Sequence, residues 1–170
     1  MAAIVSEIMS RQVVGLEPAA TLEQARTLMQ RRHIRHLPVV EQQRLIGLVS
    51  QRDILAAQES SLESGTNGDF LTSHTLADIM TREVTTISPR AGIREAALYL
   101  QKHKYGCLPV VDKGKLVGIV TDSDFVAVAI NLLEVLDNQL AGETEYDTEI
   151  DDMDAELDRS QEDIDSGSPE

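Results

Sequence analysis

The sequence predicts an α/β protein made of two β-α-β-β-α units that pack face to face as one module with approximate two-fold symmetry. Residues Val5 to Leu55 match the residues 71 positions later without a gap, and 16 of these 51 pairs are identical. Within each copy, short β-branched runs alternate with segments of helical periodicity. A unit of about 50 residues buries too little apolar surface to be stable alone, so the two copies are expected to pack together.

The first strand and first helix of each copy follow from local patterns. Strands are expected at 13–16 and 84–87, where β-branched runs end at Pro18 and Pro89. In the first copy Thr21 and Gln24 form a capping-box pattern that predicts a helix start. Apolar residues then recur at helical spacing, namely Leu22, Ala25, Leu28 and Met29 in the first copy and Ile93, Ala96, Ala97 and Leu100 in the second.

Each copy continues with a predicted hairpin and a second helix. Two apolar runs, 37–40 and 45–49, are separated by four polar residues, and the second copy repeats this with Asp112-Lys113-Gly114-Lys115 between its runs. Apolar segments that begin at Asp53 and Asp124 predict the closing helices.

Composition sets the expected boundaries. Ser, Thr and Gly are frequent between the copies, as in a linker, and few apolar residues occur near the carboxyl end. We expect a first repeat over 1–60, a linker over 61–75, a second repeat over 76–136 and an acidic, disordered tail over 137–170.

The net charge of −14 is confined to the tail. Residues 1–133 contain 14 basic and 14 acidic residues, whereas 134–170 contain 15 acidic residues and only Arg159 as a base. Acidic chains are repelled by nucleic acid and by anionic lipid, so neither is an expected partner. No basic segment followed by an apolar run opens the chain, and no apolar stretch reaches about 18 residues, so a soluble, cytoplasmic protein is expected.

No catalytic or metal-binding motif appears. Cys107 is the single cysteine and is expected to be a small buried apolar residue. Gly-x-Ser-x-Gly, Walker-type, His-Glu-x-x-His and paired Cys-x-x-Cys motifs are absent from the sequence. His33 and His36 could bind a metal, but no cysteine or acidic residue accompanies them at ligand spacing. Asp53 and Asp124 could act as an acid pair only if the fold brought them together. The expectation is a protein without enzymatic activity.

One motif occurs in both copies and has two interpretations. Gly47 to Asp53 and Gly118 to Asp124 each contain a glycine, a hydroxyl residue three positions on, and an aspartate three positions after that. Ser-x-x-Asp and Thr-x-x-Asp are helix-start patterns, and capping alone would explain them. The same geometry favours a sugar phosphate, because a helix N-terminus attracts phosphate and a carboxylate can accept both ribose hydroxyls.

These motifs together resemble a pair of cystathionine-β-synthase (CBS) domains, a Bateman module. The resemblance covers about Val5 to Leu133 and rests on Asp78 to Thr81 with Glu7 to Ser10, on His36 to Val40, and on the two glycine-hydroxyl-aspartate segments. In that family the hydroxyl contacts phosphate, the aspartate contacts ribose, and the adenine lies against the first strand and the segment around Leu-Pro. The resemblance implies two adenine-nucleotide sites.

Carried over residue by residue, the resemblance gives two candidate sets. The first is Gly15, Leu16, Arg35, His36, Leu37, Pro38, Ser50 and Asp53, and the second is Thr86, Ile87, Gly106, Cys107, Leu108, Pro109, Thr121 and Asp124. Arg35 and His36 could meet a phosphate, whereas Gly106 and Cys107 offer no charge, so unequal sites are expected. Arg31 and Arg32 are instead expected to be a solvated helix end.

Two functions from different classes remain open. In the first, the protein senses AMP, ADP, ATP or S-adenosylmethionine, forms a homodimer, and signals through an effector protein. In the second, it is a scaffold without a ligand, whose acidic tail captures a basic partner. An apolar stripe in that tail, Ile150, Met153 and Leu157, could dock on a protein or be part of a disordered segment.

Overall fold

The computed structural model describes residues 3–63 and 69–141. The chain divides into two units, Met1–Phe125 and Val126–Glu170. A helix over 122–141 begins in the first unit, and its residues from Val126 onward belong to the second. Within the described ranges, no helix has the length and apolar character needed to cross a membrane. The acidic stretch 142–170, including Ile150, Met153 and Leu157, lies outside the described residues.

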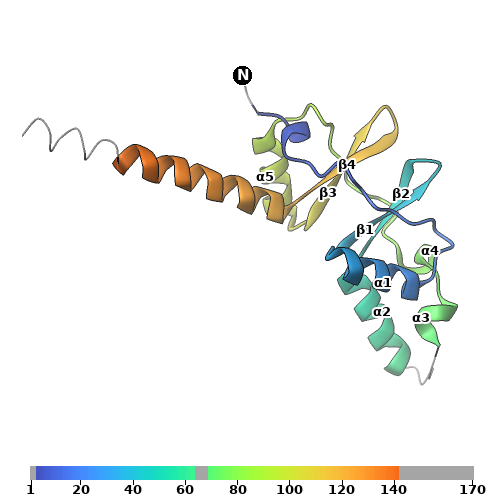
Figure 1. Ribbon diagram of the computed structural model, residues 1–170. Helices are drawn as coiled ribbons and strands as arrows, with labels where there is room; N and C mark the ends of the chain where they lie inside the picture. The colour runs from blue at the N-terminus through green and yellow to red at the C-terminus, as the bar shows by residue number, and fades with distance from the viewer. Residues whose placement is uncertain (1–2, 64–68, 142–170) are drawn as a thin grey trace, which may run out of the picture. The chain divides into compact units, whose positions relative to one another are not determined.

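The first unit contains two antiparallel hairpins, as predicted (Figure 1). Strands β1 (His36–Glu41) and β2 (Arg44–Ser50) form one, and β3 (Cys107–Asp112) and β4 (Lys115–Thr121) form the other. The registers match: His36 lies opposite Ser50 and Cys107 lies opposite Thr121. Each hairpin also has a bulge within its Val-Val pair. The copies therefore share one local fold down to its irregularities.

Helices cover the hairpins in each copy. Helix α1 (Leu22–Arg32) begins at the predicted capping box, in which Gln24 N–H donates to Thr21 Oγ1 at 3.2 Å and Thr21 N–H donates to Gln24 Oε1 at 2.9 Å. Its counterpart α5 (Ile93–His103) begins at Gly92, which has no capping side chain. Helix α2 (Gln51–Glu63) contacts α1 and β2, and α5 contacts β3.

The expected first strands are reduced to single bridges. Leu16 pairs with Val39 and Ile87 pairs with Val110, both in parallel, while the rest of 13–16 and 84–87 forms no ladder. Leu16 N–H donates to Pro38 O at 3.2 Å and Val40 N–H donates to Leu16 O at 2.9 Å. Pro38 has no N–H to extend the pairing, and the bulge after Val39 interrupts the edge of the strand.

The predicted linker and tail differ from the structure. Helix α2 runs on to Glu63, and α3 (Phe70–Ser73) packs Phe70 and Leu71 against the core of the first copy. The surrounding residues are rich in Ser, Thr and Gly, so composition alone did not indicate that Phe70 and Leu71 belong to the core. Likewise, the helix over 122–141 extends past residue 137, where the disordered tail was expected to begin.

The start of each copy is buried in the core of the other. Val5 and Met9, around the 3-10 turn η1 (Val5–Glu7), belong to the cluster that contains Leu108 and Val120. Reciprocally, Leu76 and Met80, around α4 (Leu76–Ile79), belong to the cluster of Leu22, Leu37 and Val49. Ser10 bridges to Ile119 in β4, and Thr81 bridges to Leu48 in β2. Neither copy has a complete core without the other.

This exchange explains the two motif glycines. A Cβ on Gly47 would lie 2.5 Å from Met80 Sδ, and a Cβ on Gly118 would lie 2.5 Å from Met9 Sδ. Each glycine thus leaves room for the methionine from the other copy. The close approach to the backbone at these two positions is therefore made by a core side chain and not by a ligand.

Candidate ligand-binding clefts

The motif hydroxyls and aspartates form the predicted caps. Ser50 donates to Asp53 Oδ2 from its N–H at 2.6 Å and from its hydroxyl at 2.7 Å, and Ser50 Oγ accepts from Asp53 N–H at 3.2 Å. In the second copy, Thr121 donates to Asp124 Oδ2 from its N–H at 2.6 Å and from its hydroxyl at 2.8 Å. Within the described residues, the hydrogen bonds to the two carboxylates all go to Oδ2, and Oδ1 of Asp53 and of Asp124 accepts none. A ligand hydroxyl could therefore be accepted without breaking the cap.

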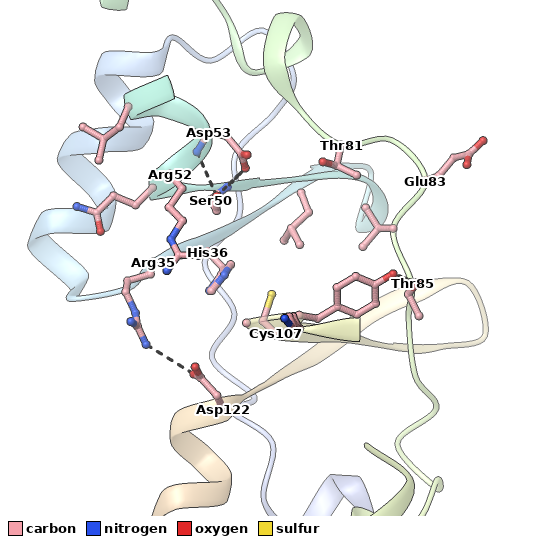
Figure 2. A pocket seen from close by; sticks show the side chains of 17 residues that line it. Arg35, His36, Ser50, Arg52, Asp53, Thr81, Glu83, Thr85, Cys107 and Asp122 are labelled. Atoms are coloured by element: carbon pink, nitrogen blue, oxygen red, sulfur yellow. Dashed lines mark hydrogen bonds and ion pairs between the residues drawn. The ribbon is translucent and has the colours of Figure 1, made fainter. Parts of the chain in front are cut away.

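Ser50 and Asp53 open onto a cleft of about 770 Å³, here called cleft A (Figure 2). This volume lies within the usual range of about 300–1,000 Å³ for small-molecule sites. The first copy contributes the cap together with Arg35, His36 and Arg52, and the second copy contributes the facing wall, which includes Lys104. Cys107 lines cleft A, and the polar and charged residues that line it are Arg35, His36, Ser50, Gln51, Arg52, Asp53, Thr81, Glu83, Thr85, Lys104, Tyr105 and Asp122.

Thr121 opens onto a smaller cleft of about 270 Å³, here called cleft B. Its walls follow the same rule, since the cap comes from the second copy and the facing segment from the first. The lining comprises Ser10, Gln12, Val13, Val14, His33, Ile34, Arg35, His36, Pro38, Ile119, Thr121, Asp122 and Ser123. Asp124 binds Thr121 from outside this lining.

The structure groups the candidate residues differently from the sequence-based sets. Ser50 and Asp53 face segment 81–85 of the second copy, and Thr121 faces segment 10–14 of the first. The reason is the exchange of entry segments, which carries each Ile-Met-Ser/Thr motif across to the other hairpin. The sequence-based sets did not include four residues that line cleft A: Thr81, Glu83, Thr85 and Tyr105. The first three belong to or follow the Ile-Met-Thr motif, and Tyr105 comes shortly before Leu108-Pro109, so both positions could have indicated them.

Several candidates lie away from both clefts. Leu37 and Leu108 are fully buried in the two cores. Leu16 and Ile87 form the parallel bridges, and Pro109 O accepts from Ile87 N–H at 3.0 Å. The remaining two also lie elsewhere: Gly15 packs against Pro38 and Val40, and Thr86 lines a separate hollow with Arg44 and Arg82.

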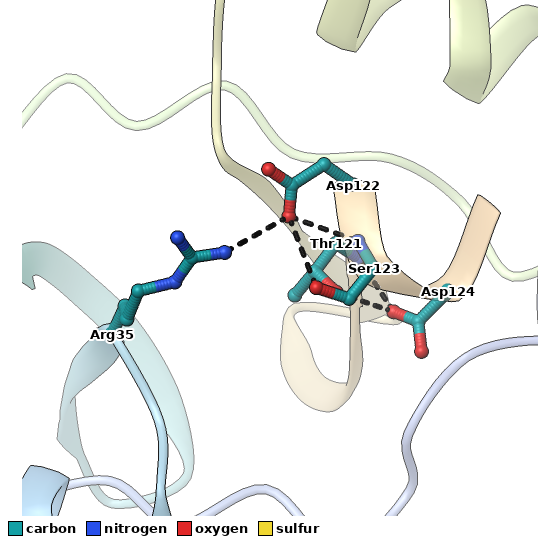
Figure 3. A network of polar contacts seen from close by, with 5 residues as sticks. All are labelled: Arg35, Thr121, Asp122, Ser123 and Asp124. Atoms are coloured by element: carbon teal, nitrogen blue, oxygen red, sulfur yellow. Dashed lines mark hydrogen bonds and ion pairs between the residues drawn. The ribbon is translucent and has the colours of Figure 1, made fainter. Parts of the chain in front are cut away.

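Three residues line both clefts: Arg35, His36 and Asp122. Arg35 Nη2 lies 3.6 Å from Asp122 Oδ1, and the same oxygen accepts from Ser123 N–H at 2.9 Å (Figure 3). The two side chains are 63% and 56% exposed, so the pair contributes about 0–1 kcal/mol. Arg35 is thus held between the clefts by a contact that costs little to break.

His36 lies at the junction of the copies. Its ring packs on Gly106, where a Cβ would lie 2.5 Å from His36 Cε1. Burial, and secondarily the charge of Arg35, holds the pKa of His36 below its usual value. The ring is therefore neutral at pH 7, and Arg35 supplies the positive charge that this part of the chain presents to both clefts.

Cys107, the counterpart of His36, is buried, and burial raises the pKa of its thiol to about 12. The thiol is protonated at neutral pH and offers cleft A an apolar surface. No group of three or more metal-ligating side chains occurs among the residues that the structure describes. His33 and His36 therefore have no third ligand within that part of the chain.

Comparison with known proteins agrees with this architecture. The family model of the CBS domain matches residues 5–60 and 76–131. The inosine-5'-monophosphate dehydrogenase of Thermoplasma acidophilum is 35% identical over 120 residues, which are 70% of this chain and 22% of that enzyme. The chain therefore spans about a fifth of the length of this relative.

Two solved structures are similar over nearly their whole length. One is the crystal structure of a Vibrio cholerae protein described as an AcuB-type acetoin utilization protein, which is 47% identical with a TM-score of 0.68 and covers 81% of this chain and 98% of its own. The other is CBSX2 of Arabidopsis thaliana in complex with AMP, 29% identical with a TM-score of 0.65, covering 76% and 97%. With both repeats matched, the chain belongs to the CBS domain family.

Proposed function

We propose that this protein is a regulatory module that binds an adenine nucleotide in cleft A, and a second one in cleft B, and catalyses no reaction. The observation that carries the proposal is the composition of cleft A. A capped serine and aspartate at the start of α2 face a wall from the other copy, and Arg35, Arg52 and Lys104 line the same space.

Each part of a nucleoside monophosphate has a suitable group in cleft A. Asp53 Oδ1 can accept the ribose hydroxyls while Oδ2 keeps the cap. Charge-assisted hydrogen bonds of this kind contribute about 1.5–3 kcal/mol each. The three cations suit the phosphate, and Val84, Tyr105 and Cys107 give the base a partly apolar surface. The AMP complex of CBSX2 supports the choice of AMP.

Signalling would pass through the exchanged segments. Because Thr81 both lines cleft A and bridges to Leu48, a ligand that contacts Thr81 also bears on the junction of the two copies. A ligand shifts such an equilibrium only by its differential affinity for two states. The proposed output is a changed interaction with an effector protein, delivered by a cytoplasmic homodimer. The acetoin utilization relative offers one process in which to look for that effector.

The test is calorimetric titration of the full chain with AMP, ADP, ATP and S-adenosylmethionine. The Asp53→Asn variant should weaken AMP binding at cleft A by 10-fold or more, because it removes the charge of the ribose acceptor while an amide can still cap the helix. Asp112→Asn, at the exposed end of β3, is the matched control and should bind as the unmodified protein does. If none of the four ligands binds, the proposal is contradicted.

The same titrations address the scaffold function. Deletion of residues 143–170 should leave AMP binding unchanged if the clefts are the working part. If no nucleotide binds and a basic partner is captured only by the chain that retains 143–170, the acidic tail is the working part instead.

A further inference from the structure

We infer that Arg35 is a single cation shared by the two clefts, so that an anionic ligand in one cleft weakens the binding of an anionic ligand in the other. The inference rests on the proposed function, because it assumes that phosphate-bearing nucleotides enter the clefts. The observation behind it is that Arg35 lines both clefts.

The asymmetry of the repeat makes Arg35 irreplaceable. Its counterpart in the second copy is Gly106, which has no side chain to offer. His36 also faces both clefts, but as a half-buried, neutral ring it adds no charge. Arg52 and Lys104 line cleft A only, and His33 lines cleft B only. Arg35 is therefore the strong cation that both clefts have in common.

Asp122 holds Arg35 between the clefts and opposes anions in both. Its carboxylate lies 3.6 Å from Arg35 and lines cleft A and cleft B, whereas its counterpart Gln51 is neutral. The first phosphate to enter must draw Arg35 away from Asp122. The second phosphate then meets a guanidinium already engaged and a carboxylate left without its partner, so its affinity falls.

The coupling between the two clefts depends on the charge of the ligand. An uncharged nucleoside gains nothing from Arg35, so its binding to one cleft should not affect the other. Direct repulsion between two bound phosphates does not require Arg35, whereas the contest for the shared cation does. The Arg35→Gln variant therefore separates the two sources of coupling.

The experiment compares each cleft with its neighbour filled and blocked. AMP and adenosine are titrated calorimetrically at 0.15 M salt into the full chain and into Asp53→Asn, at concentrations that leave the weakened cleft A of the variant largely empty. For AMP, cleft B should bind at least 10-fold more tightly in Asp53→Asn than it does in the unmodified protein with cleft A filled. For adenosine the two affinities should agree within 3-fold.

Substitution of the shared cation completes the test. In Arg35→Gln both clefts should bind AMP more weakly, and blocking cleft A should change the affinity of cleft B by less than 3-fold. Arg52→Gln, which removes a cation of cleft A only, should keep the full coupling. Asp122→Asn should tighten AMP binding in both clefts.

The outcomes separate this inference from the proposed function. If AMP binds and cleft B has the same affinity whether cleft A is filled or blocked, the sharing of Arg35 is wrong and the nucleotide-binding function stands. If only one AMP binds to the unmodified protein, AMP binding at cleft B must become measurable in Asp53→Asn. If AMP still does not bind at cleft B in that variant, the inference is overturned. If neither AMP nor adenosine binds at all, the proposed function fails and the coupling falls with it.

Discussion

The two repeats agree where they hold each other and differ where a ligand would bind. At the junction the residues are repeated, since Gly47 with Met80 and Gly118 with Met9 make the same close contact in both directions. In the clefts the copies diverge, because the residues that correspond to Arg35 and His36 in the second copy are Gly106 and Cys107. Mutual packing therefore constrains the residues of both copies equally, whereas the two copies supply different charged and polar side chains to the clefts.

The largest expected effect comes from filling the space beside the exchanged methionines. Gly118→Ala should destabilise the protein by about 1–3 kcal/mol, because its Cβ would lie 2.5 Å from Met9 Sδ and 3.2 Å from the backbone oxygen of Ser10. Gly47→Ala should cost less, since all of its near contacts are with the flexible side chain of Met80. Urea unfolding of both variants measures the difference.

Gly92→Ala is the control for this pair, because a Cβ there would meet nothing within 4 Å. Its loss should stay below about 1 kcal/mol, because alanine is a poorer residue than glycine at the N-cap of α5 but meets no side chain there. Equal losses for Gly118→Ala and Gly92→Ala would show that the exchanged methionine is not the cause. A loss in Gly47→Ala larger than in Gly118→Ala would contradict the ranking of the two copies.

Much of each copy could be predicted from the sequence, but their mutual arrangement could not. The hairpins and the Thr21 cap follow from local patterns, which act over a few residues. The exchange is different, because Val5–Met9 and Leu76–Met80 have the same apolar pattern. Either segment satisfies either core, so the pattern does not say which pairing occurs. The grouping of the site residues depended on that pairing.

A smaller effect should come from the hairpin turns, where the first copy has Gln43 and the second copy has a glycine at the matching position. Gln43 and its counterpart Gly114 both have positive φ, at 68° and 78°. A side chain in this conformation costs about 1 kcal/mol, which Gly114 avoids. Gly114→Gln should therefore destabilise the protein by about 1 kcal/mol, and Gln43→Gly should stabilise it by a similar or smaller amount.

Thermal and urea unfolding of these two variants should move in opposite directions. Because a Cβ on Gly114 meets nothing within 4 Å, no steric clash at this atom adds to the backbone strain. A loss of stability in both variants would mean that the turn of the first copy depends on the Gln43 side chain, and the comparison of the two hairpins would have to be revised.

The smallest effect concerns His36 and pH. Because burial holds the pKa of His36 below 6.5 in the folded protein, the unfolded chain takes up this proton first as the pH falls. The stability from the neutral ring is complete above pH 6.5 and is lost progressively below it. Urea unfolding at pH 7.5 and 5.5 should show a smaller loss for His36→Gln than for the unmodified protein.

The charges around the ring decide how far this loss extends. Arg35 and Arg52 oppose protonation of His36, whereas Asp122 and Asp53 favour it. Arg35→Gln should thus reduce the loss between pH 7.5 and 5.5, and Asp122→Asn should increase it. His103→Gln, at the exposed end of α5, is the control for general acid effects. If His36→Gln and His103→Gln lose stability equally, the junction ring is not the group that titrates. Cys107, which stays protonated throughout this range, makes no such contribution in the second copy.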